Sequence, residues 1–357
     1  MVRVDRLFRY PQNYDRIEEI RTSMASSTTV RKLSIGKVAG LRRLADENGI
    51  FCITAMDQRN SLRAILNPAN PGSVPNGLLA EIKISLAAAL SPHSTAILLD
   101  PQYGVPQAIT AGALDGHAGL LIALEADKPK TVGQGKVTLI APGLSAKKIG
   151  RMGGDAVKLL VRYRPDLGDA TEQNQAVVRE VADQCREADL PFVLEPVIHA
   201  LDGQSKEDFA REKPSLVIQT ARELSPWCDL FKTEFPDDIS FEKDPAVQKK
   251  HVEELDAASV VPWVILSAGA DIGPFAQVVE LACKAGASGF LAGRAIWKDY
   301  VKIEDPEERL DLLERKAVPN LGIVTNIAVR DAKPWPEHRG IEIPEPGSFD
   351  PLWYEKY

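Results

Sequence analysis

The stretch CDLFKTEFPDD, residues 228–238, has the pattern of a short inner strand that ends in charged residues. Leu230 and Phe231 are apolar, Lys232 follows at once, and Pro236 closes the run. Lysine is rarely found buried without a partner. A lysine at the end of such a strand therefore indicates either a buried ion pair or a catalytic role. Which fold places the strand in this position depends on the rest of the sequence.

Seven further segments are also short and nearly continuously apolar, and helical patterns alternate with them. The seven segments are residues 50–57, 94–100, 118–125, 155–163, 191–198, 262–269 and 288–295. The predicted helices are 36–49, 77–92, 145–154, 171–190, 213–226, 245–259 and 275–286, and a helical stretch from about 305 to 330. Continuous apolar strands are buried on both faces, as in a parallel sheet. Eight of them favour an α/β fold of the (β/α)8 TIM-barrel type. A doubly wound open sheet is the alternative, but no GxGxxG follows the first strand.

The chain of 357 residues is long enough for one such barrel with extensions. We expect an N-terminal extension over residues 1–35, a barrel domain over 36–330 and a tail over 331–357 that is rich in proline and aromatic residues. Exposed aromatic patches are avoided by monomers. The tail is therefore expected to be ordered and to pack on a barrel, more readily that of a partner subunit, which predicts a homo-oligomer.

Composition limits the classes of partner. The net charge is −7, which argues against a general nucleic-acid binder because such a protein needs a basic face. No apolar run approaches the roughly 18 residues of a membrane span, and the charged N-terminus lacks the apolar core of a signal peptide. The four cysteines are far apart and form no CxxC pair, so reduced thiols in a cytoplasmic protein are expected.

Polar residues stand at the ends of the predicted strands, where TIM barrels carry their sites. They are Asp57, Gln58 and Arg59; Asp100; Lys158; Glu195; Lys232 and Glu234; Ser267, Ala268 and Gly269; and Gly293 and Arg294. Each has a structural alternative. Asp57 or Asp100 could cap a helix, Arg59 could lie on the surface, and Glu195 could belong to an ion pair.

The two lysines within the predicted strands favour a catalytic role over a purely structural one. Lys158 and Lys232 each interrupt an otherwise apolar strand, and an unpaired buried lysine is costly. A desolvated lysine beside a second cation has a lowered pKa, and its neutral amine can attack a ketone to form a Schiff base. Glu195 could then transfer protons. The glycine-flanked turn at Gly269 and the pair Gly293–Arg294 suit an anionic group.

Metal chemistry finds less support in the sequence. The five histidines, His93, His117, His199, His251 and His338, form no HxxH or HxH pair. Zinc sites usually need clustered ligands. A zinc-dependent enzyme is therefore the weaker alternative, and neither a metal nor another cofactor is expected.

Taken together, the motifs resemble the class I tagatose 1,6-bisphosphate aldolase family. The segments are AMDQR, SPHSTAILLDPQYG, DAVKLLVRYRPD, VLEPV, FKTEFP, WVILSAG and GASGFLAGRAIW, in the family's order from about residue 45 to 325. The 6-deoxy-6-sulfofructose 1-phosphate aldolases are a sister group that shares PWVILS and AGASGFLAGRA. The segment between Glu195 and Lys232 resembles neither group closely.

The resemblance implies a cytoplasmic, cofactor-free aldolase that cleaves a phosphorylated sugar to dihydroxyacetone phosphate and an aldehyde. Lys232 falls on the Schiff-base lysine, Glu195 on the proton-transfer glutamate, and Lys158 and Asp57 on polar residues beside the substrate. Phosphate-holding segments correspond to Ser267, Gly269, Gly293 and Arg294, and Ala268, Gln58 and Arg59 are assigned to the same substrate site. A sulfonated sugar substrate and a non-catalytic sugar-phosphate-binding barrel stay open as alternatives, as do the aldehyde half and the C4 stereochemistry.

Overall fold

The computed structural model describes residues 30–357. Its centre is a closed barrel of eight parallel strands in the order β10-β11-β2-β3-β4-β7-β8-β9. The strands are β2 (Phe51–Met56), β3 (Ala96–Leu99), β4 (Gly119–Ala123), β7 (Ala156–Arg162), β8 (Phe192–Val197), β9 (Leu230–Thr233), β10 (Trp263–Ile265) and β11 (Gly289–Ala292). The eight predicted strands are all present, so the predicted TIM barrel is confirmed.

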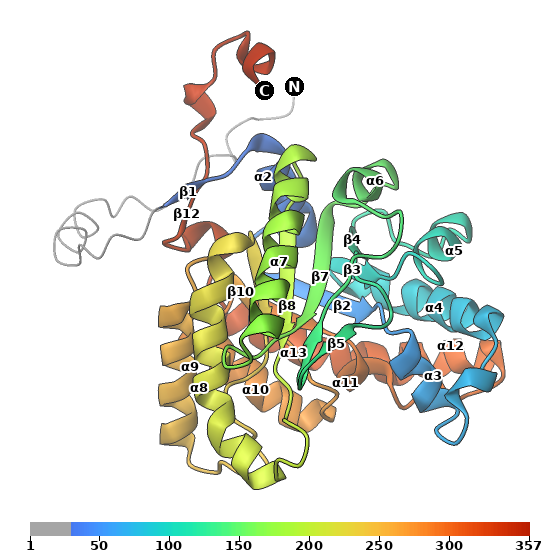
Figure 1. Ribbon diagram of the computed structural model, residues 1–357. Coiled ribbons are helices and arrows are strands. Elements are labelled where there is room, and N and C mark those ends of the chain that lie inside the picture. The colour runs from blue at the N-terminus through green and yellow to red at the C-terminus, as the bar shows by residue number, and fades with distance from the viewer. Residues whose placement is uncertain (1–29) are drawn as a thin grey trace.

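Helices surround the ring of strands (Figure 1). They are α2 (Ile35–Leu44), α3 (Asn60–Leu66), α4 (Asn76–Leu90), α5 (Val105–Thr110), α6 (Ala146–Arg151), α7 (Asp169–Glu187), α8 (Lys206–Leu224), α9 (Pro245–Ala258), α10 (Ile272–Ala285), α11 (Arg294–Trp297), α12 (Pro306–Leu312) and α13 (Val318–Asp331). A hairpin of β5 (Lys130–Val132) and β6 (Gly135–Val137) is inserted between β4 and α6.

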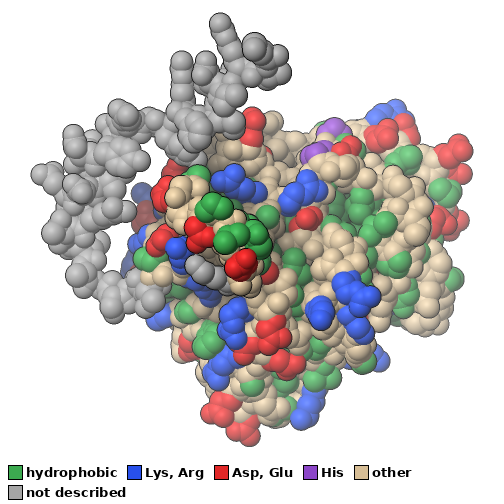
Figure 2. All heavy atoms as spheres, turned by 90° about the horizontal axis from the view of Figure 1, so that it is seen from above, with side chains coloured by type: hydrophobic (Ala, Val, Ile, Leu, Met, Phe, Trp, Pro, Cys, Tyr) green, Lys and Arg blue, Asp and Glu red, His purple; other side chains and the backbone are tan. Residues whose placement is uncertain are grey.

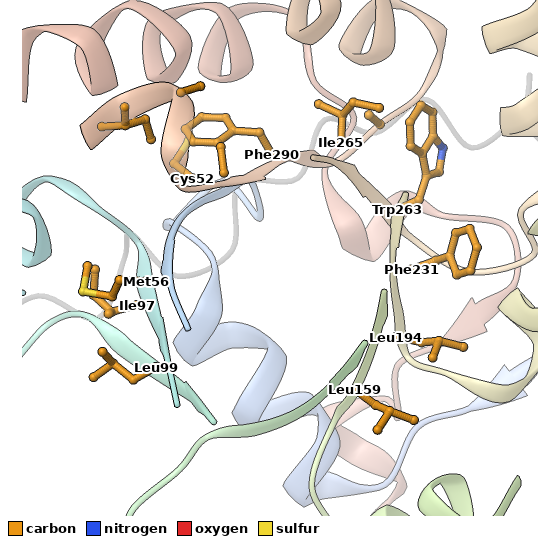
Figure 3. Packing of buried hydrophobic residues seen from close by; sticks show 14 of the residues in the cluster. Cys52, Met56, Ile97, Leu99, Leu159, Leu194, Phe231, Trp263, Ile265 and Phe290 are labelled. Atoms are coloured by element: carbon orange, nitrogen blue, oxygen red, sulfur yellow. The ribbon is translucent and has the colours of Figure 1, made fainter. Parts of the chain in front are cut away.

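Alternate residues of each barrel strand belong to two separate apolar layers. Outward residues such as Phe231, Trp263 and Phe290 pack between the strands and the helices, and Figure 3 shows them pointing away from the ring. Inward residues such as Val193 and Leu230 fill the barrel interior. Burial on both faces explains why the strands are continuously apolar. It also places inward residues two apart on the same wall, which decides which polar side chains reach the mouth.

The N-terminal end of the barrel is closed by both ends of the described chain. Strand β1 (Arg31–Lys32) pairs in parallel with β12 (Ile341–Glu342), and Arg31 and Lys37 form ion pairs of 2.6 and 2.8 Å with Asp229, just before β9. Leu41, Leu44 and Trp335 are buried against the inward layer. Burying a leucine stabilises a fold by about 1.5–3 kcal/mol, so this closure stabilises the barrel. The opposite end stays free for a site.

Some sequence-based boundaries were wrong. Helix α8 begins at Lys206 rather than at residue 213 and runs through Pro214. Its start is fixed by Ser205, whose side chain accepts a hydrogen bond from the N–H of Asp208. The stretch predicted as one helix over 305–330 contains a π-helical turn at Leu313–Ala317 between α12 and α13. The β5–β6 hairpin was not predicted.

The tail beyond β12 differs from the part before it. Trp335 and Ile341 are buried, whereas Phe349, Leu352 and Tyr354 are 37%, 51% and 59% exposed. The Tyr357 hydroxyl accepts a hydrogen bond of 2.8 Å from the N–H of Gly36. Seen from above, the face that carries the C-terminal segment shows hydrophobic side chains gathered among acidic and basic ones (Figure 2). Docking of this segment on a partner subunit stays a prediction.

Candidate functional site

Three carboxylates surround the ammonium group of Lys158, an inward residue of β7 that is fully buried. Its Nζ atom lies 2.7 Å from Asp57, 2.9 Å from Glu125 and 3.0 Å from Glu195. Burial disfavours the charged amine, but the three carboxylates outweigh burial and raise the pKa of Lys158 well above its usual value. Lys158 is therefore a fixed cation at neutral pH.

Glu195 bridges the two lysines that the sequence singled out. Its Oε1 atom lies 2.7 Å from Nζ of Lys232, and its Oε2 atom lies 3.0 Å from Nζ of Lys158. The three residues come from the adjacent strands β9, β8 and β7. One carboxylate thus contacts both a candidate nucleophile and a permanent cation, an arrangement suited to moving a proton at Lys232.

A desolvated lysine beside a second cation was expected to have a lowered pKa, but the pKa of Lys158 is raised, because its three carboxylate partners outweigh burial. The pKa of Asp57 is shifted in the opposite sense. Burial acts to raise it, but the charges of Lys158 and Lys232 prevail and lower it. Asp57 is therefore ionised and Lys158 protonated at neutral pH.

Glu125 belongs to this cluster although sequence reasoning missed it. It lies beyond β4, is 7% exposed, and its second oxygen accepts a 3.0 Å hydrogen bond from the N–H of Leu160. The signal was available, since Glu125 ends the third predicted strand as Asp57 ends the first. With Glu125 included, Lys158 has more carboxylate contacts than a simple ion pair would require.

Glu234 is a further buried carboxyl group at the mouth, two residues beyond Lys232. One of its oxygens accepts a 2.7 Å hydrogen bond from the N–H of Ile198. Burial raises the pKa of Glu234 above its usual value, and the nearby charge of Lys213 opposes this. The environment of Glu234 thus shifts its carboxyl group towards the protonated form.

Asp100, also at a strand end, has a structural role instead. Its carboxylate forms a buried ion pair with Lys83 of α4 and accepts hydrogen bonds from the N–H groups of Gln102 and Tyr103. These contacts fix the turn after β3. Asp100 does not cap the next helix, as was considered from sequence, because α5 begins after Gly104 without a side-chain cap.

The ends of β10 and β11 form a wall suited to an anion. Ala268 and Gly269 have φ values of 47° and 82°, and the left-handed conformation is strained for alanine. A Cβ atom at Gly269 would lie 3.2 Å from the guanidinium carbon of Arg294, so that group lies over bare backbone. A Cβ atom at Gly293 would lie 2.3 Å from the Ala55 carbonyl oxygen, which requires glycine there. Such strain is typical of functional turns.

Gln58 and Arg59 lie on the next part of the rim, after β2. The Nε atom of Arg59 lies 2.7 Å from Asp127, and its Nη2 atom donates a 3.0 Å hydrogen bond to the Glu125 carbonyl. Within residues 30–357, buried Nη1 of Arg59 and Oε1 of Gln58 have no hydrogen-bond partner. Buried polar atoms are normally satisfied, so these atoms are available to a ligand.

These groups meet in a cavity of about 390 Å³ at the C-terminal ends of the strands. Predicted residues that line it are Asp57, Gln58, Arg59, Glu195, Lys232, Ser267, Ala268, Gly293 and Arg294. Lys158 lies beneath it through its contacts with Asp57 and Glu195, and Gly269 lies under Arg294. The volume is within the range of small-molecule sites. The predicted residues thus converge from strands that lie far apart in the sequence.

Two general properties concern the described part of the chain. No group of three or more His, Cys, Asp or Glu side chains among residues 30–357 is placed to hold a metal ion. In the same range, no helix is both long and apolar enough to cross a membrane.

Comparison with known proteins agrees with the geometry. A model of the DeoC/LacD family aldolases matches residues 51–299. A tagatose 1,6-diphosphate aldolase of Listeria monocytogenes serotype 4a is 30% identical over 327 residues, covering 85% of this chain and 95% of the relative. Tagatose 1,6-diphosphate aldolase 1 of Streptococcus mutans is 29% identical over 319 residues, covering 83% and 97%.

Solved structures support the fold. The fructose-bisphosphate aldolase of Slackia heliotrinireducens aligns with a TM-score of 0.56 at 14% identity, covering 82% of this chain and 88% of that one. The predicted resemblance to tagatose 1,6-bisphosphate aldolases and the prediction of an aldolase are both confirmed. The chain belongs to the DeoC/LacD family of aldolases.

Proposed function

We propose that this protein is a class I aldolase that cleaves a ketose 1,6-bisphosphate of the tagatose type through a Schiff base at Lys232. The observation that carries the proposal is the position of Glu195, 2.7 Å from Lys232 and 3.0 Å from the fixed cation Lys158. The relatives named tagatose 1,6-diphosphate aldolase support the substrate class.

The first half of the reaction forms the iminium ion. The neutral amine of Lys232 attacks the C2 carbonyl of the ketose and gives a carbinolamine. Glu195 takes the proton that Lys232 gives up to become a neutral amine and then donates it to the C2 hydroxyl, which leaves as water as the C2=N⁺ double bond forms. Lys158 and Asp57 keep opposite charges beside the reacting carbon, so the site is preorganised for the charge that develops.

The second half breaks the C3–C4 bond. Glu195, now a carboxylate, takes the proton of the C4 hydroxyl, and the aldehyde leaves as the bond electrons move into the iminium nitrogen. The resulting enamine is protonated at C3, and water then hydrolyses the iminium to release dihydroxyacetone phosphate and free Lys232. We assign the C1 phosphate to the wall of Ser267, Gly269 and Arg294, where a guanidinium group lies over bare backbone.

Cellular location and assembly are proposals as well. The four cysteines are buried free thiols, which supports the reducing cytoplasm. The exposed aromatic residues of the tail support a homo-oligomer.

A cleavage assay tests the proposed function. Release of dihydroxyacetone phosphate is measured with tagatose 1,6-bisphosphate, fructose 1,6-bisphosphate and 6-deoxy-6-sulfofructose 1-phosphate, each with and without EDTA. We expect turnover of a bisphosphate that is indifferent to EDTA. Loss of turnover with EDTA would favour the zinc-dependent alternative, and tight binding without cleavage would favour the non-catalytic barrel.

A further inference from the structure

The cavity carries a second arginine on the wall opposite Arg294. Arg294 follows β11 and Arg162 ends β7, and these strands are four positions apart in the ring of eight. Arg162 is also on the inward alternation of its strand, four residues beyond Lys158, and both Arg162 and Arg294 line the cavity. The two guanidinium groups therefore face the cavity from opposite sides.

Arg162 is exposed, and within residues 30–357 no acidic side chain pairs with its guanidinium group. Among residues 30–357 its side chain makes no ion pair or hydrogen bond, whereas Arg59 is held by Asp127 at 2.7 Å. Burial raises the pKa of Glu234, and the charges of Lys213 and, to a smaller degree, Arg162 oppose this rise. Arg59 still offers one buried Nη1 atom without a partner. The guanidinium of Arg59 is held by groups that follow β4, the neighbour of β7, so this wall presents unused donors to a ligand.

We infer that Arg162, assisted by Arg59, binds a second tetrahedral oxyanion at the end of the substrate remote from Arg294. The inference rests on the proposed function and makes it more specific. If Arg294 holds the C1 phosphate and Lys232 attacks C2, the opposite wall receives the aldehyde half. A phosphate or sulfonate at C6 matches the planar, bidentate donors of arginine. Arg162 is then a specificity residue that selects substrates with two anionic ends.

Arg162→Gln and Arg162→Lys test the inference, with the exposed rim residue Lys128→Gln as a matched loss of charge. For each protein, kcat/KM is measured on tagatose 1,6-bisphosphate, on 6-deoxy-6-sulfofructose 1-phosphate and on fructose 1-phosphate, which lacks the second anion. We expect Arg162→Gln to lower the ratio of kcat/KM for the two-anion substrates over that for fructose 1-phosphate by roughly ten- to a hundred-fold. Arg162→Lys should restore part of the ratio, and Lys128→Gln should preserve it.

The outcomes separate this inference from the proposed function. An unchanged ratio in Arg162→Gln, with a wild-type enzyme that cleaves the bisphosphate, would overturn the inference and leave the proposed function standing. An equal fall in Lys128→Gln would show a general effect of charge and would overturn it too. If the wild type cleaves none of the three sugars, the proposed function fails and the inference fails with it. The two-anion substrate whose kcat/KM falls more in Arg162→Gln shows whether this wall binds a phosphate or a sulfonate more strongly.

Discussion

The Oε1 atom of Glu195 lies 2.7 Å from the Nζ atom of Lys232. The other oxygen of the same carboxylate contacts Lys158, so Glu195 has one side on a candidate nucleophile and one on a fixed cation. In the proposed mechanism this carboxylate gives and takes each proton before carbon–carbon cleavage.

Glu195→Gln should lower kcat by roughly 10²–10⁴-fold with little change in KM, because general acid–base catalysis typically contributes that much. Glu125→Gln is the matched control, since Glu125 lies 2.9 Å from Lys158 and, within residues 30–357, forms no ion pair with Lys232. Steady-state kinetics on both variants check the prediction. Equal losses in the two would show that Glu195 acts through the charge of Lys158 alone.

Arg294→Ala should raise KM for a ketose 1-phosphate by roughly ten- to a hundred-fold, since a charge-assisted hydrogen bond contributes about 1.5–3 kcal/mol. Its guanidinium lies over Gly269, where bare backbone adjoins the proposed phosphate site. Arg294→Lys should recover part of the loss. A KM that Arg294→Ala leaves unchanged would contradict the assignment of the C1 phosphate to this wall.

Lys158→Met should make stability depend on pH between about pH 5 and about pH 8. The variant leaves Asp57, Glu125 and Glu195 buried together without their cation, so their folded-state pKa values rise above the unfolded values of about 4. A carboxyl group with a raised folded pKa loses stability as pH rises through that pKa. We expect a loss of about 3–5 kcal/mol at the higher pH and a smaller loss at the lower one.

Chemical denaturation of Lys158→Met and wild type at the two pH values measures this effect. Lys284→Met is the control, because Lys284 pairs with Glu280 on the surface and its removal should be nearly neutral at either pH. A pH-independent difference between Lys158→Met and wild type would show that the carboxylates are not held ionised by Lys158.

Deletion of residues 344–357 should lower the oligomeric mass while the enzyme keeps its activity. This segment exposes Phe349, Leu352 and Tyr354, and it follows β12 at the N-terminal end of the barrel, away from the cavity. Light scattering of the truncated and full-length proteins measures the mass. A mass unchanged by the deletion would rule out docking on a partner and favour a tail that packs on its own barrel.

The fold was predictable because both faces of every barrel strand are buried. Continuous apolar runs such as that ending at Lys232 can pack in few other ways, and parallel strands bring their C-terminal ends to one mouth. The same rule located Asp57, Glu195 and Lys232 in one cavity. Helix α8 was placed too late because Pro214 resembles a helix start, whereas the capping contacts of Ser205 lie further upstream.

The site residues that the sequence analysis missed depend on which strands are neighbours in the barrel and on which face of its strand each residue lies. Glu125 and Lys158 are 33 positions apart, and their 2.9 Å contact exists only because β4 and β7 are neighbours. The two-residue repeat of a strand places Arg162 on the same face as Lys158. Because Arg162 stands between the apolar residues Val161 and Tyr163 at the end of the strand, the sequence analysis did not recognise that its side chain reaches the cavity. The contacts that set the charge of Lys158 could not be read from spacing for the same reason.

Trapping with sodium borohydride tests the central claim most directly. Reduction in the presence of dihydroxyacetone phosphate should fix the ligand to the protein as a stable secondary amine. Peptide mass spectrometry should locate the added mass on Lys232 and not on Lys158, and Lys232→Ala should neither be labelled nor turn over substrate. Label on another lysine alone, or turnover that survives in Lys232→Ala, would contradict the account.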